Sequence, residues 1–220
     1  FYNMYKFAQS YEAIPILSYN LAQIIKSVFG KNKKCLVLDL DNTLWGGVIG
    51  DDGVNGIQLG HETPVGEGFI AFQRYILMLK ERGIILAVCS KNNLEIAKSG
   101  FEHPDSLLKV EDFVAFIANW EPKHLNLVKI AEMINIGLDS LVFIDDNPVE
   151  REIIRENLPE VMVPEVVAGD PGSYIEALEL GKYFEQINIS EDDLKRNLTY
   201  MKNKQRDDLQ LEFSSYDEFL

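Results

Sequence analysis

Short continuous apolar runs alternate with amphipathic stretches along the middle of the chain. Such runs are typical of strands buried on both faces of a sheet, and they occupy residues 35–40, 84–90, 114–118, 141–144 and 161–163. Between them, apolar residues recur three or four positions apart and predict helices over residues 69–82, 94–101, 124–134 and 148–157. Alternating strands and helices predict parallel strands joined by right-handed crossovers. We therefore expect an α/β fold, a doubly wound three-layer parallel sheet.

Helical segments are predicted on both sides of this domain. Leu17, Leu21 and Val28 recur at helical spacing and predict a helical arm, over residues 1–32, that packs on the core. Residues 190–208 begin with serine and acidic residues and become basic, a gradient that suits a helix dipole. The expected organisation is this arm, a main domain over residues 33–188, and a C-terminal helix and linker over residues 189–220, cut before a further domain.

Composition narrows the classes of function. The 220 residues include 35 acidic and 21 basic side chains, a formal net charge of -14, which disfavours binding to nucleic acids or anionic membranes. No apolar run reaches the roughly 18 residues that a membrane span needs. Cys35 and Cys89 both lie within apolar runs, which suits reduced thiols. The sequence therefore predicts a cytoplasmic protein with no nucleic-acid partner and no membrane span.

Polar residues follow four of the predicted strands in turn. They are Asp39, Asp41 and Thr43 after the first, Ser90, Lys91 and Asn92 after the second, Lys123 after the third, and Asp145 and Asp146 after the fourth. Because the carboxyl ends of parallel strands meet at one edge of a sheet, we expect these side chains to share a crevice. Crowded carboxylates repel one another unless a cation offsets their charge. A hard divalent ion with oxygen ligands fits, and we expect Mg²⁺.

This arrangement suits chemistry at phosphorus. Asp39, directly at a strand end, is the expected nucleophile, and Asp41 is placed to transfer a proton at the bridging oxygen while its backbone carbonyl binds the metal. Ser90 and Lys123 would hold the phosphoryl oxygens. Taken alone, each of these residues is more often part of a solvated turn or a surface charge. The interpretation depends on their order at successive strand ends.

Four short strings carry a family resemblance. LVLDLDNT, AVCSK, NWEPK and VFIDDN resemble the four motifs of the haloacid dehalogenase (HAD) superfamily, and longer strings such as LDLDNTLWGGVIGDDGVNGIQLG are similar to its FkbH-like branch, subfamily IIIC. The resemblance implies that Asp39 is the nucleophile, Asp41 the acid and base, and Asp145 a direct metal ligand. It implies that Asp146 acts on the metal through water or orients a partner. Thr43, Lys91 and Asn92, at the same strand ends, are expected to bind substrate with Ser90 and Lys123.

The segment between the first strand and the first helix is rich in glycine. Residues 45–68 hold Gly46, Gly47, Gly50, Gly53, Gly56, Gly60, Gly66 and Gly68. Glycine permits tight reversals, so we expect a short twisted hairpin over the crevice. The resemblance implies that this hairpin is a flap that gates the site, although an ordinary surface hairpin is the alternative. No insertion is long enough for a large cap domain.

Three functions stay open at this point. The first is a magnesium-dependent phosphatase that acts on a phosphorylated small molecule through an aspartyl-phosphate on Asp39. The FkbH-like resemblance implies the second, a glyceryl transferase that loads a 1,3-bisphosphoglycerate-derived unit onto an acyl carrier protein; Cys89 would be an acyl acceptor, or more simply a small buried residue. The third is a non-catalytic docking module, which the full set of acids disfavours.

Three side chains near the crevice have two interpretations each. Trp45 either walls the site or seals the hairpin against the sheet, and we favour the seal. Arg151 and Arg155 either meet an anionic substrate or pair with Glu150 and Glu152, and we favour the pairing.

Overall fold

The core of the protein is a parallel sheet. The computed structural model describes residues 10–185, and within them the sheet has four strands in the order β3-β2-β1-β4. The strands are β1 (Cys35–Leu38), β2 (Ile85–Ser90), β3 (Ala115–Ala118) and β4 (Leu141–Ile144). Leu38 is level with Val88 of β2 on one side and with Ile144 of β4 on the other. The predicted parallel sheet is therefore confirmed.

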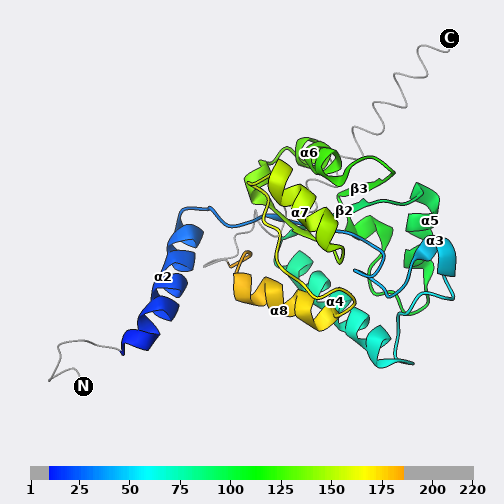
Figure 1. The fold of residues 1–220 in the computed structure, drawn as a ribbon, viewed down its shortest axis with the longest axis horizontal. Coiled ribbons are helices and arrows are strands. Elements are labelled where there is room, and N and C mark those ends of the chain that lie inside the picture. The colour runs from blue at the N-terminus through cyan, green and yellow to red at the C-terminus, as the bar shows by residue number, and fades with distance from the viewer. Residues whose placement is uncertain (1–9, 186–220) are drawn as a thin grey trace, which may run out of the picture.

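Helices cover both faces of the sheet (Figure 1). Because successive side chains of a strand point to opposite faces, Leu36 and Leu38 join one core cluster, and Cys35 and Val37 join the other. The first cluster is closed by α4 (Pro64–Glu81), α5 (Leu94–Ser99) and α8 (Pro171–Gly181), and the second by α6 (Lys123–Ile134) and α7 (Pro148–Asn157). The three-layer arrangement predicted from the apolar pattern is confirmed.

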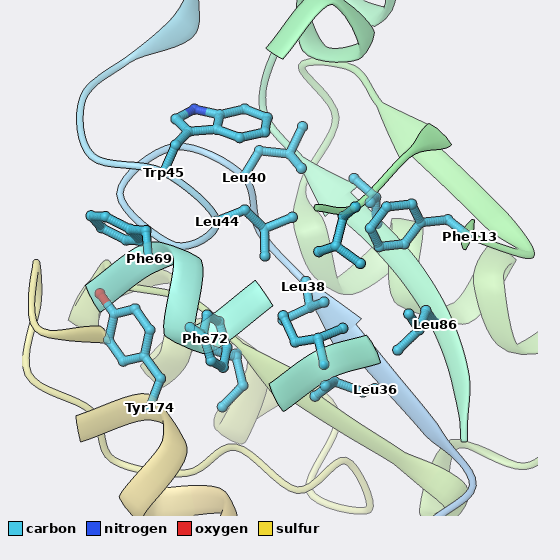
Figure 2. Close-up of a cluster of buried hydrophobic side chains, with 14 of the residues drawn as sticks. Leu36, Leu38, Leu40, Leu44, Trp45, Phe69, Phe72, Leu86, Phe113 and Tyr174 are labelled. Carbon is cyan, nitrogen blue, oxygen red and sulfur yellow. The ribbon is translucent and has the colours of Figure 1, made fainter. Parts of the chain in front are cut away.

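The first cluster is rich in aromatic rings (Figure 2). Phe72 of α4 is fully buried and meets the ring of Tyr174 of α8 edge to face, with 5.4 Å between their centroids. Burying one such side chain stabilises the fold by about 1.5–3 kcal/mol. This packing holds α4 and α8 side by side on the sheet.

The path of the chain creates a switch point in the sheet. It runs outward from β1 to β2 and β3 along one side, then crosses by α6 and returns as β4 on the other side of β1. Connections from β1 and β4 therefore leave toward opposite faces. Ligands bind at such a point, beyond the carboxyl ends of the strands.

Several shorter elements complete the described chain. They are the 3₁₀ turns η1 (Tyr11–Ala13), η2 (Gly100–Glu102), η3 (Val110–Asp112) and η4 (Leu138–Ser140), and the helices α2 (Ile14–Val28) and α3 (Ile49–Asp52). No helix within residues 10–185 is long and apolar enough to cross a membrane.

The helix boundaries differ from the predictions mainly at α4 and α8. Helix α4 starts five residues before the predicted residue 69, because Thr63 accepts a hydrogen bond from Gly66 N and Pro64 occupies the first turn. Helix α8 was not predicted, although Asp170 caps it in the same way and Pro171 begins it.

The predicted fifth strand at residues 161–163 is wrong. Met162 forms one isolated parallel bridge with Val142 instead of a strand. Pro159 and Pro164 flank this segment and have no backbone N–H to donate. A longer ladder therefore cannot form.

The N-terminal helix is present, but its predicted packing on the core is wrong. No residue of α2 is buried, and Leu21 and Val28 are 58% and 66% exposed. Tyr19 Oη donates to the carbonyls of Leu180 and Gly181, both at 3.0 Å. Both faces of the sheet are already covered by other helices, which leaves α2 outside the core (Figure 1). The predicted C-terminal helix at residues 190–208 lies outside the described residues.

The glycine-rich insert is not the predicted hairpin. Gly46 and Gln58 pair at its base, with N···O distances of 3.0 and 2.7 Å, and the chain between them contains the one-turn helix α3. Asp52 Oδ2 accepts a hydrogen bond from Val48 N at 2.8 Å. This contact closes a helical turn, whereas a hairpin would need extended backbone. We call the insert a pinned loop, because the Gly46–Gln58 pair holds it at its base.

Candidate active site

The predicted acidic residues meet at the switch point. Asp39 follows β1 and Asp145 follows β4, and Asp39 N donates to Ile144 O at 3.0 Å, which carries the ladder one residue further. Beside them opens a crevice of about 370 Å³. Its lining includes seven of the predicted site residues, Asp39, Asp41, Ser90, Lys91, Lys123, Asp145 and Asp146. Asn147, which follows the fourth strand with the two acids, also lines it, and sequence reasoning had missed the other lining residues, Asn42, Pro148, Glu150 and Ala168.

A buried lysine bridges the two strand ends. Lys123 Nζ lies 2.6 Å from Asp145 Oδ2 and 2.9 Å from Asp39 Oδ1. Lys123 is only 3% exposed, Asp39 6% and Asp145 0%. Burial lowers the pKa of Lys123, but the two carboxylates raise it by more than burial lowers it. The net result is a pKa above the ordinary value of lysine. The lysine therefore stays charged inside the protein.

Negative charge still exceeds positive charge at this point. Burial raises the pKa of Asp145, the charge of Asp39 raises it further, and Lys123 lowers it in part. Burial and Asp39 also raise the pKa of Asp146. Both shifts have the same physical origin, because each carboxylate is held near another in a region of low dielectric constant.

Three carboxylates are arranged as a metal site requires. Oxygens of Asp39, Asp145 and Asp146 all lie within 4.8 Å of one another. Of these oxygens, Asp39 Oδ1 has the Lys123 ammonium 2.9 Å away as its cationic partner. A group of closely placed carboxylate oxygens suits a hard divalent cation.

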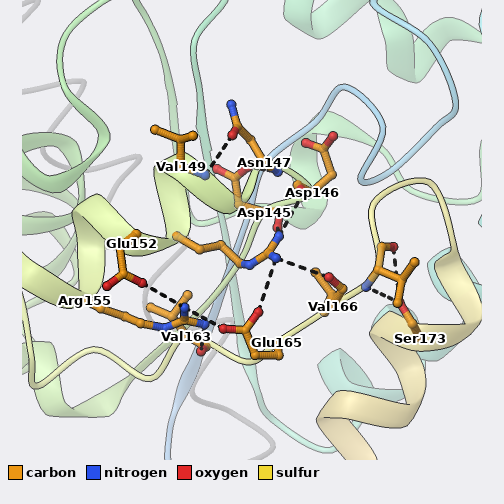
Figure 3. Close-up of polar contacts among 12 residues, drawn as sticks. Asp145, Asp146, Asn147, Val149, Glu152, Arg155, Val163, Glu165, Val166 and Ser173 are labelled. Atoms are coloured by element: carbon orange, nitrogen blue, oxygen red, sulfur yellow. Dashed lines mark hydrogen bonds and ion pairs between the residues drawn. The ribbon is translucent and has the colours of Figure 1, made fainter.

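Arg151 holds the backbone of the second acidic turn. Its Nη1 donates to the carbonyl oxygens of Asp145 at 2.9 Å and Asp146 at 2.8 Å, and its Nη2 donates to Glu165 and to Val166 O (Figure 3). The favoured pairing of Arg151 with glutamates on its own helix is therefore wrong. An arginine can satisfy several carbonyls at once because its guanidinium has five donors.

The neighbouring polar pairs follow a different pattern from the predicted one. Arg155 does pair with Glu152, at 3.3 Å, and also with Glu165, at 2.6 Å. Glu150 instead pairs with Lys91, at 2.5 Å across the crevice. The lysine expected to bind substrate therefore already has a carboxylate partner.

The carboxylate of Asp41 receives three hydrogen bonds. Trp45 Nε1 at 3.0 Å and Ile49 N at 2.9 Å donate to Oδ1, and Asn92 Nδ2 at 3.0 Å donates to Oδ2. Burial raises the pKa of Asp41, while the donors from Ile49 and Trp45 lower it in part. Trp45 is fully buried, as expected of a residue that seals the insert against the sheet.

Two predicted substrate-binding residues are placed elsewhere. Thr43 is fully buried and Asn92 is 5% exposed, and neither lines the crevice. Asn92 instead donates to Asp41, which does line the crevice, and the expected contact of Thr43 and Asn92 with substrate stays a prediction. No residue of the insert between 45 and 68 is among the lining residues of the crevice either, and the role of the insert as a flap stays a prediction.

Cys89 is a buried thiol. Its Sγ lies 3.8 Å from Lys123 O, and burial raises the pKa of Cys89 to about 12. A thiol in this state is a poor nucleophile, because the reactive form is the thiolate.

Solved structures resemble the chain in both fold and sequence. The N-terminal part of the protein BF1531 from Bacteroides fragilis, which contains a phosphatase domain and was crystallised with Mg, is 49% identical over 85% of this chain, with a TM-score of 0.79. The HAD domain of the effector protein Lem4 from Legionella pneumophila is 15% identical, and the match covers 76% of this chain and 99% of that one at a TM-score of 0.50. The chain has the HAD fold. The fold expected from the four motifs is thereby confirmed.

The similarity to the Bacteroides structure covers only part of its length, and no comparison identifies the subfamily. The chain spans half the length of the Bacteroides structure that it matches. No family model matches the sequence, and no curated protein does. The FkbH-like assignment stays a prediction.

Proposed function

We propose that this chain is a magnesium-dependent HAD phosphatase that hydrolyses phosphate monoesters through an aspartyl-phosphate on Asp39. The observation that carries the proposal is the buried Lys123, which lies within 2.9 Å of carboxylates from two neighbouring strand ends, beside a third carboxylate. A structural ion pair alone would not need three acids. The phosphatase domain in the Bacteroides relative supports the same function.

The proposed reaction has two steps. In the first, an oxygen of Asp39 attacks phosphorus, the bond from phosphorus to the ester oxygen breaks, and Asp41 gives its proton to the leaving alkoxide. In the second, water attacks the aspartyl-phosphate, Asp41 takes a proton from that water, and Asp39 and inorganic phosphate are released. Lys123 and Ser90 stabilise the charge on the phosphoryl oxygens.

The carboxylates of Asp39, Asp145 and Asp146, with the backbone carbonyl of Asp41, are proposed to hold Mg²⁺. The bound ion supplies positive charge that offsets the carboxylates and the phosphoryl oxygens. Asp146 acts through water or directly, and its position within 4.8 Å of the other two acids allows either.

The substrate is proposed to be a phosphorylated small molecule, which the crevice of about 370 Å³ can hold in part. The alternative of glyceryl transfer to an acyl carrier protein has less support. Its candidate acceptor Cys89 is buried and its pKa is raised to about 12, so it would have to be exposed and deprotonated first. A docking module is disfavoured because the polar side chains needed for chemistry share one crevice.

The test is the hydrolysis of p-nitrophenyl phosphate with and without Mg²⁺. Replacing the nucleophile by Asp39→Asn should lower kcat by about a thousandfold or more, and chelation of the metal should abolish the activity of the wild type. Asp51→Asn is the matched control, because Asp51 is an exposed aspartate of the nearby insert. An active Asp39→Asn variant would show that Asp39 is not the nucleophile.

A further inference from the structure

The three donors to Asp41 come from different parts of the chain. Trp45 lies just beyond the turn, Ile49 begins α3 of the insert, and Asn92 lies in the loop between β2 and α5. Together they satisfy both carboxylate oxygens. A side chain that lines an open crevice can normally rotate about its last torsion, but donors on both oxygens restrict this rotation.

The Trp45 donor is itself tightly packed. Its indole ring is fully buried and meets Phe101 edge to face, with 5.3 Å between the centroids. A Cβ methyl group added to Gly100, the first residue of η2, would lie only 2.5 Å from Trp45 Cη2. The indole ring therefore fills the space beside Gly100. Packing of this kind leaves the indole N–H one direction, which is toward Asp41.

The Asn92 donor is held by a second contact. Asn92 is nearly buried, and its Oδ1 accepts a hydrogen bond from Asn93 N at 2.9 Å. With its oxygen committed there, its amide nitrogen faces Asp41. Neither Asn92 nor Trp45 lines the crevice, so any effect of these side chains on a reaction there passes through Asp41.

We propose that Trp45 and Asn92 are positioning residues, which fix the carboxylate of Asp41 in the orientation needed to pass a proton to the leaving oxygen. The inference rests on the proposed function. In the step concerned, the bond from phosphorus to oxygen breaks, the proton moves from Asp41 to that oxygen, and Asp41 is left as a carboxylate. A carboxylate free to rotate would spend most of its time in unproductive orientations.

This role predicts a dependence on the leaving group. An alkoxide is a poor leaving group and needs the proton, whereas p-nitrophenolate leaves readily without it. The value of kcat/KM reports the steps up to release of the leaving group, before Asp41 acts on water in the second step. A variant with a misoriented Asp41 should therefore lose kcat/KM on alkyl phosphates and keep most of it on p-nitrophenyl phosphate. A side chain with a merely structural role would lower both rates together.

The kinetic experiment compares glycerol phosphate with p-nitrophenyl phosphate in the presence of Mg²⁺. Trp45→Phe keeps a buried aromatic ring and removes the N–H, and Asn92→Ala removes the other side-chain donor. For each variant, kcat/KM on glycerol phosphate should fall about ten- to hundredfold, with a much smaller change of kcat/KM on p-nitrophenyl phosphate. The matched control is Tyr174→Phe, which removes a hydrogen bond to Asn42 O of the same turn and leaves the donors to Asp41 in place. Its two rates should keep the wild-type ratio.

A second readout is independent of activity. The chain has two tryptophans, Trp45 and Trp120, so a Trp120→Phe background gives one indole N–H signal in a ¹⁵N NMR spectrum. Asp41→Asn should move that signal upfield, because an amide oxygen accepts a weaker hydrogen bond than a carboxylate. Asp51→Asn should leave it in place.

The outcomes separate the two proposals. If the wild type hydrolyses both esters and Trp45→Phe and Asn92→Ala lose the same factor of kcat/KM on each, the positioning role is overturned and the proposed function stands. An indole signal that does not respond to Asp41→Asn also overturns the positioning role. If the wild type hydrolyses neither ester, the proposed function itself fails.

Discussion

The two acidic turns at the switch point are held in opposite ways. In the turn after β1, donors from Trp45 and Asn92 hold the side chain of Asp41. In the turn after β4, Arg151 holds the backbone carbonyls of Asp145 and Asp146. The contacts in the first turn thus fix the orientation of a carboxylate group. The contacts in the second turn fix the backbone that carries two carboxylate groups.

This difference matches the chemistry proposed for each turn. A group that transfers a proton needs one orientation of its oxygens, whereas acids that bind a cation must bring their oxygens close to one another. Holding the second turn by its backbone keeps the carboxylates of Asp145 and Asp146 on the crevice wall, where Asp145 also accepts hydrogen bonds from Lys123 Nζ and Asn147 N. Lys123 connects the two turns, because it contacts both Asp39 and Asp145.

The largest effect is expected where the two turns are joined. Lys123→Met should lower the free energy of unfolding in EDTA by about 3–5 kcal/mol, because it leaves two buried carboxylates without their cationic partner. Mg²⁺ should restore part of the loss, since the ion also offsets these charges. Lys129→Met is the control, because Lys129 pairs with Glu121 at the surface and should cost about 0–1 kcal/mol. Urea unfolding measures both, and equal losses would show that Lys123 does not hold the turns together.

A smaller effect, confined to the second turn, is expected from Arg151→Met. Losing the clamp on the carbonyls of Asp145 and Asp146 should weaken Mg²⁺ binding about 10–100-fold, as measured by calorimetry. The indole signal of Trp45 should stay in place, because the first turn does not depend on Arg151. Arg155→Met, which loses contacts with exposed glutamates and Val163 O, should bind Mg²⁺ like the wild type. An unchanged affinity for Mg²⁺ in Arg151→Met would show that the second turn does not depend on Arg151.

The smallest effect concerns pH in the metal-free protein. Burial, and then the charge of Asp39, raise the pKa of Asp145, so the folded state binds this proton more tightly than the unfolded chain does. This contribution to stability is therefore complete below the unfolded pKa and is lost as pH rises through the folded one. Between about pH 4 and pH 8 the wild type should lose on the order of 2 kcal/mol relative to Asp145→Asn.

Urea titrations in EDTA at both pH values measure that difference. Asp51→Asn, which removes an exposed carboxylate, should follow the pH dependence of the wild type. A wild type that instead gains stability over Asp145→Asn as pH rises would reverse the sign expected here.

The sequence pattern predicted most of the scaffold. Residues 141–144 and 148–157 were predicted as the strand and helix that the structure contains, because a buried run ends at an acidic turn and Pro148 starts the next helix. The convergence of Asp39, Ser90, Lys123 and Asp145 could be predicted as well. It follows from the parallel topology, which places the carboxyl ends of all strands at one edge.

Side-chain contacts between distant segments could not be predicted in this way. Asn92 and Asp41 are 51 residues apart, and the contact between them makes an expected substrate ligand a partner of the acid. Arg151 and Glu165 form another such pair. Periodicity says which face of an element is buried, but it does not say which donor reaches which acceptor.

Local sequence determined the order of strands and helices and the acidic residues at the strand ends, because both depend on near neighbours and on burial. Only the tertiary structure decided that α2 stays outside the core, that the insert folds as a pinned loop, and that each acidic turn is held by its own set of donors. The physical reason is that a hydrogen bond requires a donor and an acceptor within about 3 Å in a defined direction. That direction is set when segments far apart in the chain pack together.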